Sequence, residues 1–315
     1  MSDLAVLVTC PPMQRTAADW KGRFEALGIE VDMPPVIQQL TPADLLTLLP
    51  RFDGMIAGDD PLTAEVLENA TRLRVVSKWG IGLDSIDLPT AERLGIRVTN
   101  TPDSFGDEVA DVVIGYMVML ARRLHRIDRS VREGEWEKRQ GISLAGRTLG
   151  IVGLGSIGRA VAVRGIAMGM HVIGHEIFEP NARRAAELGV QPVDLETLIA
   201  DSDLVSLHCP LTDQNRHMID AARLSRMRPG AFLLNTARGP LIDEAALIEA
   251  LESGHLGGAA LDVFEEEPLP TSSPLTRLEN VVLGSHNASN TREAVARVNG
   301  LAIDNVLKGM AEVKR

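Results

Sequence analysis

The feature that most constrains the fold is a glycine-rich segment at residues 148–158, Thr-Leu-Gly-Ile-Val-Gly-Leu-Gly-Ser-Ile-Gly. It places a Gly-x-Gly-x-x-Gly pattern between an apolar strand and an amphipathic helix, as in a dinucleotide-binding βαβ unit. Gly153 would permit the tight turn, Gly155 would let backbone N–H groups approach phosphates, and Gly158 would let the helix pack close to the strand. The positive end of the helix dipole would then favour a pyrophosphate at this turn.

The strand that follows the glycine loop strengthens this interpretation. A glycine turn alone is weak evidence, because such turns also occur wherever the backbone needs a positive φ or close packing. Here an apolar strand at 170–174 leads to Glu176. An acid that binds the ribose is expected roughly 20 residues after the glycine loop, and Glu176 lies close to that distance from Gly158. The Glu176 carboxylate would accept hydrogen bonds from the ribose hydroxyls and repel a 2′-phosphate, so the sequence favours NAD(H) over NADP(H).

The bulk composition limits the class of protein. A chain of 315 residues exceeds what one core usually holds, so two domains are expected. The formal charge of −11 argues against nucleic acid or an anionic membrane as the main partner. Two cysteines are too few for a disulfide framework or a zinc knuckle, and no metal site is expected. With no visible export signal and no apolar stretch long enough to span a bilayer, we expect a cytoplasmic protein.

The pattern of apolar segments predicts an α/β protein with two parallel sheets. In the first part, strands at 4–9, 55–57 and 73–77 alternate with helical stretches at 16–27 and 63–69. A continuous helix is expected from Ser104, capped by Ser104 and Asp107, to about Arg132. A second series follows, with strands near residues 150, 172, 205, 233, 260 and 282.

The last stretch, 291–308, reads as an amphipathic helix that returns to pack on the first domain, although packing in a dimer is the alternative. We therefore predict a Rossmann dinucleotide-binding domain over 99–286. The substrate-binding domain would be a discontinuous, flavodoxin-like parallel α/β unit over 1–98 and 287–315. A cleft is expected where the carboxyl ends of the two sheets face each other.

Three segments place polar side chains after predicted strands. Arg238 follows a strand at 231–235, where its guanidinium could hold a carboxylate bidentately, or it could be a surface residue at a turn. Asp262 ends another strand and could reach the nicotinamide carboxamide, and Glu267 lies just before a proline. His286 follows the last strand; as an isolated histidine it would more often be structural.

Together these segments make five motifs in one order: 153–158 (Gly-Leu-Gly-Ser-Ile-Gly), 205–212 (Val-Ser-Leu-His-Cys-Pro-Leu-Thr), 235–239 (Asn-Thr-Ala-Arg-Gly), 262–268 (Asp-Val-Phe-Glu-Glu-Glu-Pro) and the His286 segment. Over nearly the whole chain this order resembles the D-2-hydroxyacid dehydrogenase family, including its D-3-phosphoglycerate dehydrogenase and glyoxylate/hydroxypyruvate reductase branches. The resemblance implies an NAD-dependent enzyme that interconverts a D-2-hydroxy acid and its 2-keto acid, and it implies a homodimer.

The resemblance also assigns roles to residues. Arg238 would bind the substrate carboxylate and keto oxygen, and His286, paired with Glu267, would be the acid/base. The loop from Trp79 would hold the substrate carboxylate with its backbone N–H groups. The cofactor-binding residues implied are Gly153, Gly155, Ser156, Ile157, Gly158, Glu176, His208, Pro210, Thr212, Thr236, Ala237, Asp262 and Ser289; the substrate-binding residues are Lys78, Trp79, Gly80, Ile81, Gly82 and Arg238.

The sequence departs from the phosphoglycerate dehydrogenase pattern where an arginine usually helps to bind phosphate. Here the turn reads Ala57-Gly-Asp-Asp-Pro61, and two acids at the mouth of the cleft would repel a phosphate. Lys78 could still attract one, or it could be only a solvated strand end. In the second case the substrate would be smaller, or uncharged at its far end.

A second class of function uses the same scaffold. An NAD(H)-sensing binding protein, like the transcriptional co-repressors that resemble this family, could keep Arg238, Glu267 and His286 without turnover. Such a sensor would bind NADH and reduce no small keto acid, which distinguishes it from the enzyme.

Overall fold

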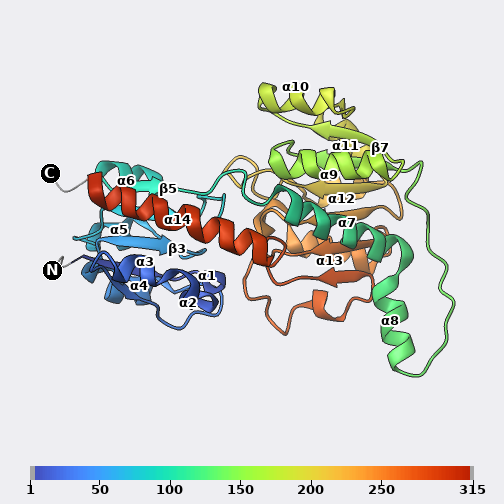
Figure 1. Cartoon of the computed structure of the whole chain (residues 1–315). Coiled ribbons are helices and arrows are strands. Elements are labelled where there is room, and N and C mark those ends of the chain that lie inside the picture. The colour runs from blue at the N-terminus through green and yellow to red at the C-terminus, as the bar shows by residue number, and fades with distance from the viewer. Residues whose placement is uncertain (1–3, 313–315) are drawn as a thin grey trace. The chain divides into compact units, whose positions relative to one another are not determined.

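The computed structural model describes residues 4–312 and divides the chain into two compact units. Residues 4–104 and 290–312 form unit 1, and residues 105–289 form unit 2 (Figure 1). The contact boundaries thus lie a few residues from the predicted domain limits of 98/99 and 286/287. The predicted α/β class with two parallel sheets is confirmed.

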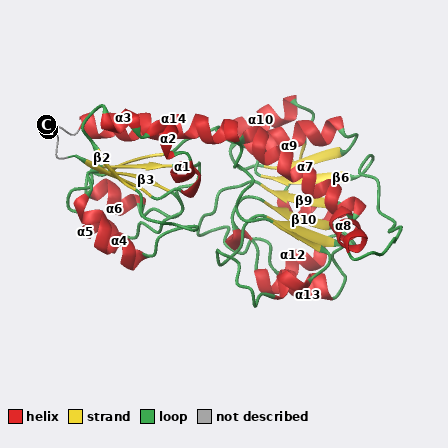
Figure 2. Cartoon of the chain, turned by 60° about the horizontal axis from the view of Figure 1, so that its bottom comes forward, coloured by secondary structure: helices red, strands yellow, loops and turns green. Residues whose placement is uncertain are grey.

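Unit 1 is built on a parallel sheet with the strand order β2-β1-β3-β4-β5, the flavodoxin-like order. Figure 2 shows α2, α3 and α14 on one face of this sheet and α4, α5 and α6 on the other. The elements are β1 (Ala5–Val8), α1 (Pro11–Arg15), α2 (Ala17–Trp20), α3 (Gly22–Glu25), β2 (Glu30–Asp32), α4 (Pro42–Leu48), η1 (Leu49–Arg51), β3 (Gly54–Ala57), α5 (Ala64–Asn69), β4 (Val75–Lys78), α6 (Leu88–Arg93), β5 (Arg97–Thr99) and α14 (Arg292–Glu312).

The helical stretch predicted over 16–27 forms as two short helices, α2 and α3, with Lys21 between them, and a third short helix, α1, precedes it. Between α1 and α2, the Thr16 hydroxyl lies 3.2 Å from the Pro12 carbonyl oxygen and 3.1 Å from that of Met13, so a side chain competes with the helical backbone pattern. The sequence pattern also missed the two outer strands, β2 and β5. Their residues are only partly buried, so they lack the apolar runs of the inner strands.

The carboxyl-terminal helix α14 packs on the sheet of unit 1. A Cβ atom on Gly309 would lie 2.4 Å from Val75 Cγ2, and one on Gly54 would lie 2.8 Å from Val306 Cγ2. Two glycines therefore allow α14 to approach β3 and β4 closely. The helix extends the predicted 291–308 by about one turn.

Unit 2 contains a parallel sheet with the order β8-β7-β6-β9-β10-β11-β12, the doubly wound Rossmann order with one further strand. Figure 2 shows α7 and α9 on one face and α12 and α13 on the other. The elements are α7 (Gly106–Arg122), α8 (Leu124–Arg132), β6 (Thr148–Val152), α9 (Ser156–Ala167), β7 (His171–His175), α10 (Glu179–Glu187), β8 (Gln191–Pro192), α11 (Leu195–Asp201), β9 (Leu204–Leu207), α12 (Ala221–Arg226), β10 (Phe232–Asn235), η2 (Gly239–Leu241), α13 (Glu244–Glu252), β11 (Gly258–Leu261), η3 (Pro274–Arg277) and β12 (Val281–Leu283).

The single helix predicted from Ser104 to about Arg132 is wrong at its start and in its middle. Helix α7 begins at Gly106 with no side-chain cap, and the Ser104 hydroxyl donates to the Pro102 carbonyl. The helix breaks at Arg123, whose φ of 54° is left-handed, and α8 follows in a new direction. Over residues 4–312, no helix combines the length and the apolarity needed to cross a membrane.

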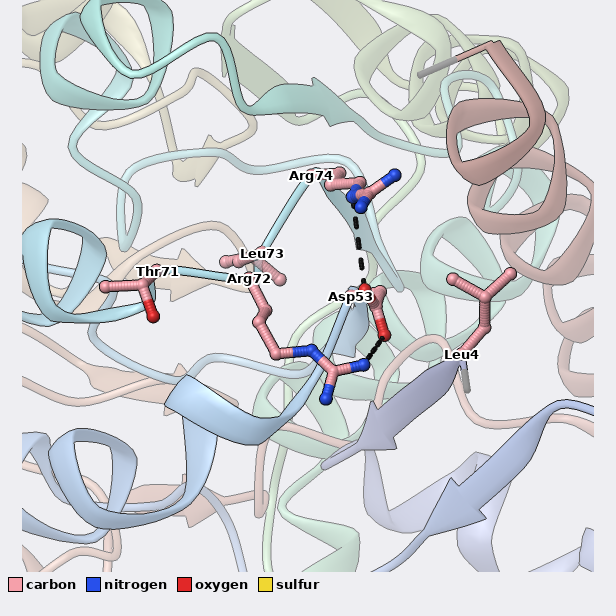
Figure 3. A pocket seen from close by; sticks show the side chains of 6 residues that line it. All are labelled: Leu4, Asp53, Thr71, Arg72, Leu73 and Arg74. Atoms are coloured by element: carbon pink, nitrogen blue, oxygen red, sulfur yellow. Dashed lines mark hydrogen bonds and ion pairs between the residues drawn. The ribbon is translucent and has the colours of Figure 1, made fainter. Parts of the chain in front are cut away.

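A cavity of about 340 Å³ lies at the amino ends of β1, β3 and β4 (Figure 3). The buried Asp53 carboxylate accepts hydrogen bonds from the Ala5 N–H at 3.1 Å and from Arg72 Nη2 at 2.7 Å, and Arg74 Nε lies 3.9 Å away. These ionic groups compensate one another, and the cavity is at the sheet end opposite to the carboxyl edge where ligands of such folds bind. We therefore assign it to the folding of unit 1.

Candidate active site

The glycine loop of unit 2 has the geometry that its three glycines predict. Gly153 has a φ of 90°, and a Cβ atom there would lie 2.6 Å from the Cys209 nitrogen. A Cβ on Gly158 would lie 2.0 Å from the Gly153 carbonyl oxygen, so the helix could not pack as it does. At Gly155, by contrast, the space is open within 4 Å. This opening lets a ligand approach the backbone, which fits a bound dinucleotide pyrophosphate.

Helix α9 begins in this loop with Gly155 as its N-cap, and no side chain of residues 4–312 caps that end. The first N–H groups of a helix have no intrahelical partner, so those of the first turn, which includes Ser156 and Ile157, are available to phosphate oxygens. Beside the loop, Glu176 Oε2 accepts from the Leu154 N–H at 2.8 Å and Oε1 accepts from the Phe178 N–H at 2.8 Å. The carboxylate of Glu176 is therefore fixed against the loop.

We expect Glu176→Ala to weaken NADH binding about tenfold, because the charge-assisted hydrogen bonds that this carboxylate is expected to make to the ribose would be lost. The preference for NADH over NADPH should narrow, because a 2′-phosphate no longer meets a carboxylate. Fluorescence titration with both cofactors measures this. Glu179→Ala, which removes an exposed carboxylate paired with Arg183 on α10, is the control. An unchanged ratio in the Glu176 variant would refute the ribose role.

The segment after β9 carries His208, Pro210 and Thr212 at the carboxyl edge of the same sheet. Asn215, which the sequence did not single out, fixes this segment: its Oδ1 accepts from the Thr212 N–H at 2.7 Å and its Nδ2 donates to the Pro210 carbonyl at 2.8 Å. His208 Nε2 lies 2.8 Å from the Ser206 hydroxyl. Burial lowers the pKa of His208 to about 3, so its imidazole is neutral at physiological pH.

This low pKa predicts an acid sensitivity of folding. Between pH 6.5 and about 3 the unfolded chain binds a proton at His208 and the folded chain does not. The free energy of unfolding should therefore fall as the pH decreases through this range and should level off below it. Thermal unfolding of His208→Gln at pH 7 and pH 4.5 should show a smaller loss than the wild type. His171→Gln, at an exposed position, should behave as the wild type, and equal losses in all three proteins would contradict the prediction.

Arg238 lies in a tight turn after β10 that the buried Asn235 organises. Asn235 Nδ2 donates to the Arg238 carbonyl at 2.8 Å, and its Oδ1 accepts from the Ala237 N–H at 3.0 Å. Arg238 is half-buried, and its Nη1 donates to the Ala237 carbonyl at 2.8 Å. The Thr236 hydroxyl is buried and finds no hydrogen-bond partner among residues 4–312. A buried polar atom of this kind fits contact with a bound cofactor.

Glu267 and His286 are brought together in unit 2. His286 Nδ1 lies 2.7 Å from Glu267 Oε2, and Glu267 Oε1 accepts from the Phe264 N–H at 2.9 Å. Both side chains are mostly buried: 25% of the His286 side chain and 17% of the Glu267 side chain are exposed. The carboxylate is thus fixed by the backbone and engages one ring nitrogen, which orients the imidazole.

Asp262 holds the loop that carries His286 through hydrogen bonds. The His286 backbone has a left-handed φ of 53°, and its N–H donates to the Asp262 carbonyl at 2.7 Å. The buried Asp262 Oδ2 accepts from the Ala288 N–H at 2.8 Å, just before Ser289. The hydroxyl of Tyr116 on α7 lies 3.4 Å from Asp262 Oδ1, and burial raises the pKa of Asp262. The sequence missed Tyr116, although it is the single tyrosine of the chain.

In unit 1 the loop at 78–82 contains some groups that hold the loop in place and others that a ligand could contact. The Trp79 side chain is buried and its Nε1 donates to Asn299 Oδ1 on α14 at 2.7 Å, so this side chain anchors the loop. Gly80 has a φ of 138°, and its N–H donates to the Thr101 hydroxyl at 3.2 Å. Within the described residues, the N–H groups of Ile81 and Gly82 find no acceptor in the protein.

Lys78 is not a solvated strand end. Its side chain is 3% exposed, and its Nζ lies 2.7 Å from Asp59 Oδ1. The expectation that both acids of this turn would repel a phosphate is wrong for Asp60, which is buried and accepts hydrogen bonds from the Leu40 N–H at 2.9 Å and the Gly58 N–H at 2.9 Å. Asp60 therefore holds the turn, and Asp59 is the partly exposed acid.

Comparisons with known proteins agree with this geometry. The family described as "D-isomer specific 2-hydroxyacid dehydrogenase, NAD binding domain" matches residues 114–288. The chain is 44% identical to a glyoxylate reductase of Korarchaeum cryptofilum over 79% of this chain and 76% of that protein. It is 39% identical to a hydroxypyruvate reductase of Thermotoga maritima over 86% and 89%.

Among solved structures, the TT0316 protein of Thermus thermophilus matches with a TM-score of 0.84 and 35% identity, covering 98% of this chain and 97% of that one. Nothing in these comparisons supports an NAD(H)-sensing binding protein. The match to the family extends over more than half of the chain and includes the glycine loop, Arg238, Glu267 and His286. The chain therefore belongs to the D-isomer-specific 2-hydroxyacid dehydrogenase family, with NAD as its cofactor.

Proposed function

We propose that the chain works as a 2-keto acid reductase, with His286 as the acid/base, Glu267 as its partner and Arg238 as the group that binds the substrate carboxylate and keto oxygen. The single observation that most supports this proposal is the 2.7 Å contact between Glu267 Oε2 and His286 Nδ1. A carboxylate at this distance stabilises an imidazolium, the form that can donate a proton. Because Glu267 engages Nδ1, the transferred proton is assigned to Nε2.

Each side chain has a distinct part in the reduction. Bound NADH supplies the hydride that reduces the keto carbon. As that carbon is reduced, negative charge develops on its oxygen, where the Arg238 guanidinium stabilises it and His286 delivers a proton. In the reverse direction, neutral His286 accepts the proton of the hydroxyl group. Glu267 keeps the ring oriented in both directions.

The cofactor would be held at the carboxyl edge of the unit 2 sheet. The glycine loop and the first turn of α9 would bind the pyrophosphate, and Glu176 would bind the ribose. The segments of residues 208–212 and 236–237, with Asp262 and Ser289, would line the nicotinamide end. Asp262 already accepts from the Ala288 N–H, so contact with the carboxamide would use its second oxygen.

We propose that the substrate is a small 2-keto acid, because the relatives most similar in sequence include a glyoxylate reductase and a hydroxypyruvate reductase. The N–H groups of Ile81 and Gly82 would hold its carboxylate, which fits their lack of protein acceptors among the described residues. The predicted cytoplasmic homodimer stays a prediction.

The test is NADH oxidation at neutral pH against glyoxylate, hydroxypyruvate, pyruvate, a longer branched 2-keto acid and 3-phosphohydroxypyruvate. Turnover of at least one of these acids supports the reductase. NADH binding without turnover of any of them would refute the reductase and favour a sensor.

A further inference from the structure

An enclosed ion pair lies at the carboxyl edge of the unit 1 sheet. Lys78 is the last residue of β4 and pairs in register with Ala57, the last residue of β3. The turn after β3 then returns over Lys78: its ammonium donates to the Gly58 carbonyl and lies 2.7 Å from Asp59 Oδ1. With 3% of the side chain exposed, the positive charge of Lys78 is both buried and neutralised.

This ion pair is adjacent to the loop that we propose for the substrate carboxylate. A Cβ atom on Gly80 would lie 3.8 Å from Lys78 Cε and 3.9 Å from Nζ. Gly80 directly precedes Ile81 and Gly82, so the ion pair of Lys78 and Asp59 borders this loop. A charge on Asp59 is therefore close enough to act on a substrate held there.

The group that meets the solvent at this place is the acid and not the base. The Asp59 side chain is 32% exposed, about ten times the exposed fraction of Lys78. The uncharged side-chain amide of Gln38 lies 3.4 Å from Asp59 Oδ2, so it leaves the charge of Asp59 in place. Asp60, the other acid of the turn, is buried and hydrogen-bonded to backbone N–H groups. An anionic group that approaches this edge meets Asp59 before Lys78.

We propose that Asp59 is a specificity-determining residue that excludes substrates with a second negative charge. The substrate class is then 2-keto acids whose far end is uncharged, such as glyoxylate and hydroxypyruvate, and not their phosphorylated counterparts. This inference rests on the proposed reductase function. Lys78 serves to hold Asp59 in place and does not bind a phosphate.

The test measures kcat/KM for hydroxypyruvate and for 3-phosphohydroxypyruvate with NADH in the full-length protein. In the wild type we expect hydroxypyruvate to be preferred. Asp59→Asn keeps an oxygen that can accept from Lys78 and removes the charge, so the ratio of phosphorylated to unphosphorylated substrate should rise about tenfold. The rise should shrink at high salt, because exposed charges are screened. Glu68→Gln, a change on α5 that breaks an exposed ion pair with Arg93 on α6, should leave the ratio at its wild-type value.

A second variant avoids any loss of folding from unpairing Lys78. Gln38→Lys places a positive charge opposite Asp59 Oδ2 and leaves the buried pair intact, and it should raise the same ratio. A ratio unchanged in both variants of an active enzyme overturns the role of Asp59 and leaves the reductase standing. A wild-type enzyme that prefers 3-phosphohydroxypyruvate also overturns the role of Asp59 and leaves the reductase standing. A wild type that reduces neither acid, nor any other in the panel, overturns the reductase and this inference together.

Discussion

His286→Ala is expected to lose reductase activity by a factor of about 10² to 10⁴, the usual contribution of a positioned general acid. NADH binding should persist, because the glycine loop follows β6 and Glu176 follows β7, whereas His286 follows β12 at the far edge of the same sheet. Steady-state NADH oxidation gives the first quantity, and fluorescence titration with NADH gives the second. Together the two measurements distinguish the loss of a proton donor from the loss of the folded structure.

The chain contains a matched control for this variant. His217 Nε2 lies 2.7 Å from Glu265 Oε1, the same separation as in the His286 and Glu267 pair, but both side chains are about 40% exposed. His217→Ala removes a histidine–carboxylate contact of the same length from the same unit, and it should retain wild-type turnover. Near-wild-type rates in His286→Ala would exclude this residue as the acid/base.

Arg238→Met is expected to lower kcat/KM by a factor of about 10² to 10³, because the charge that develops on the keto oxygen is no longer stabilised. Both kcat and KM should worsen, since the guanidinium would bind the carboxylate in the ground state and the oxygen in the transition state. The free energy of unfolding should change little, because two hydrogen bonds between the Asn235 side chain and the backbone hold the turn.

Two further variants define the role of Arg238. Arg238→Lys keeps a charge and loses the planar fork of donors, so it should recover only part of the activity. Arg277→Met removes a positive charge from an exposed position on η3 and should match the wild type. Equal losses in Arg238→Met and Arg277→Met would mean that the total charge, and not the Arg238 site, controls activity.

The parts of the fold that the sequence predicted are those with strong local signals. The inner strands of both sheets are runs of mostly apolar, buried residues, and the glycine loop must form a turn because Gly153 has a positive φ and Gly158 allows no side chain. The outer strands β2 and β5 were missed because their partly buried residues lack such runs. The break at Arg123 has no glycine or proline to reveal it, since an arginine adopts the left-handed conformation there.

For the candidate site, the sequence located groups that follow strands and missed those that hold them. Glu267 and His286 were located because each follows a neighbouring strand of one sheet, and their pairing was implied by the resemblance to the dehydrogenase family. Asn215 and Tyr116 reach the site from a turn and from a helix, and no local pattern marks their direction. The state of Lys78 depends on how the turn after β3 closes over it, which is a tertiary contact, so the sequence left its role open.

The measurement that tests the central claim most directly is the product of hydroxypyruvate reduction. The protein is incubated with NADH and hydroxypyruvate, NADH consumption is followed by absorbance, and the glycerate formed is resolved by chiral chromatography. The account predicts one glycerate per NADH consumed and the D enantiomer alone. L-glycerate, or NADH that stays unoxidised while still bound, would contradict it.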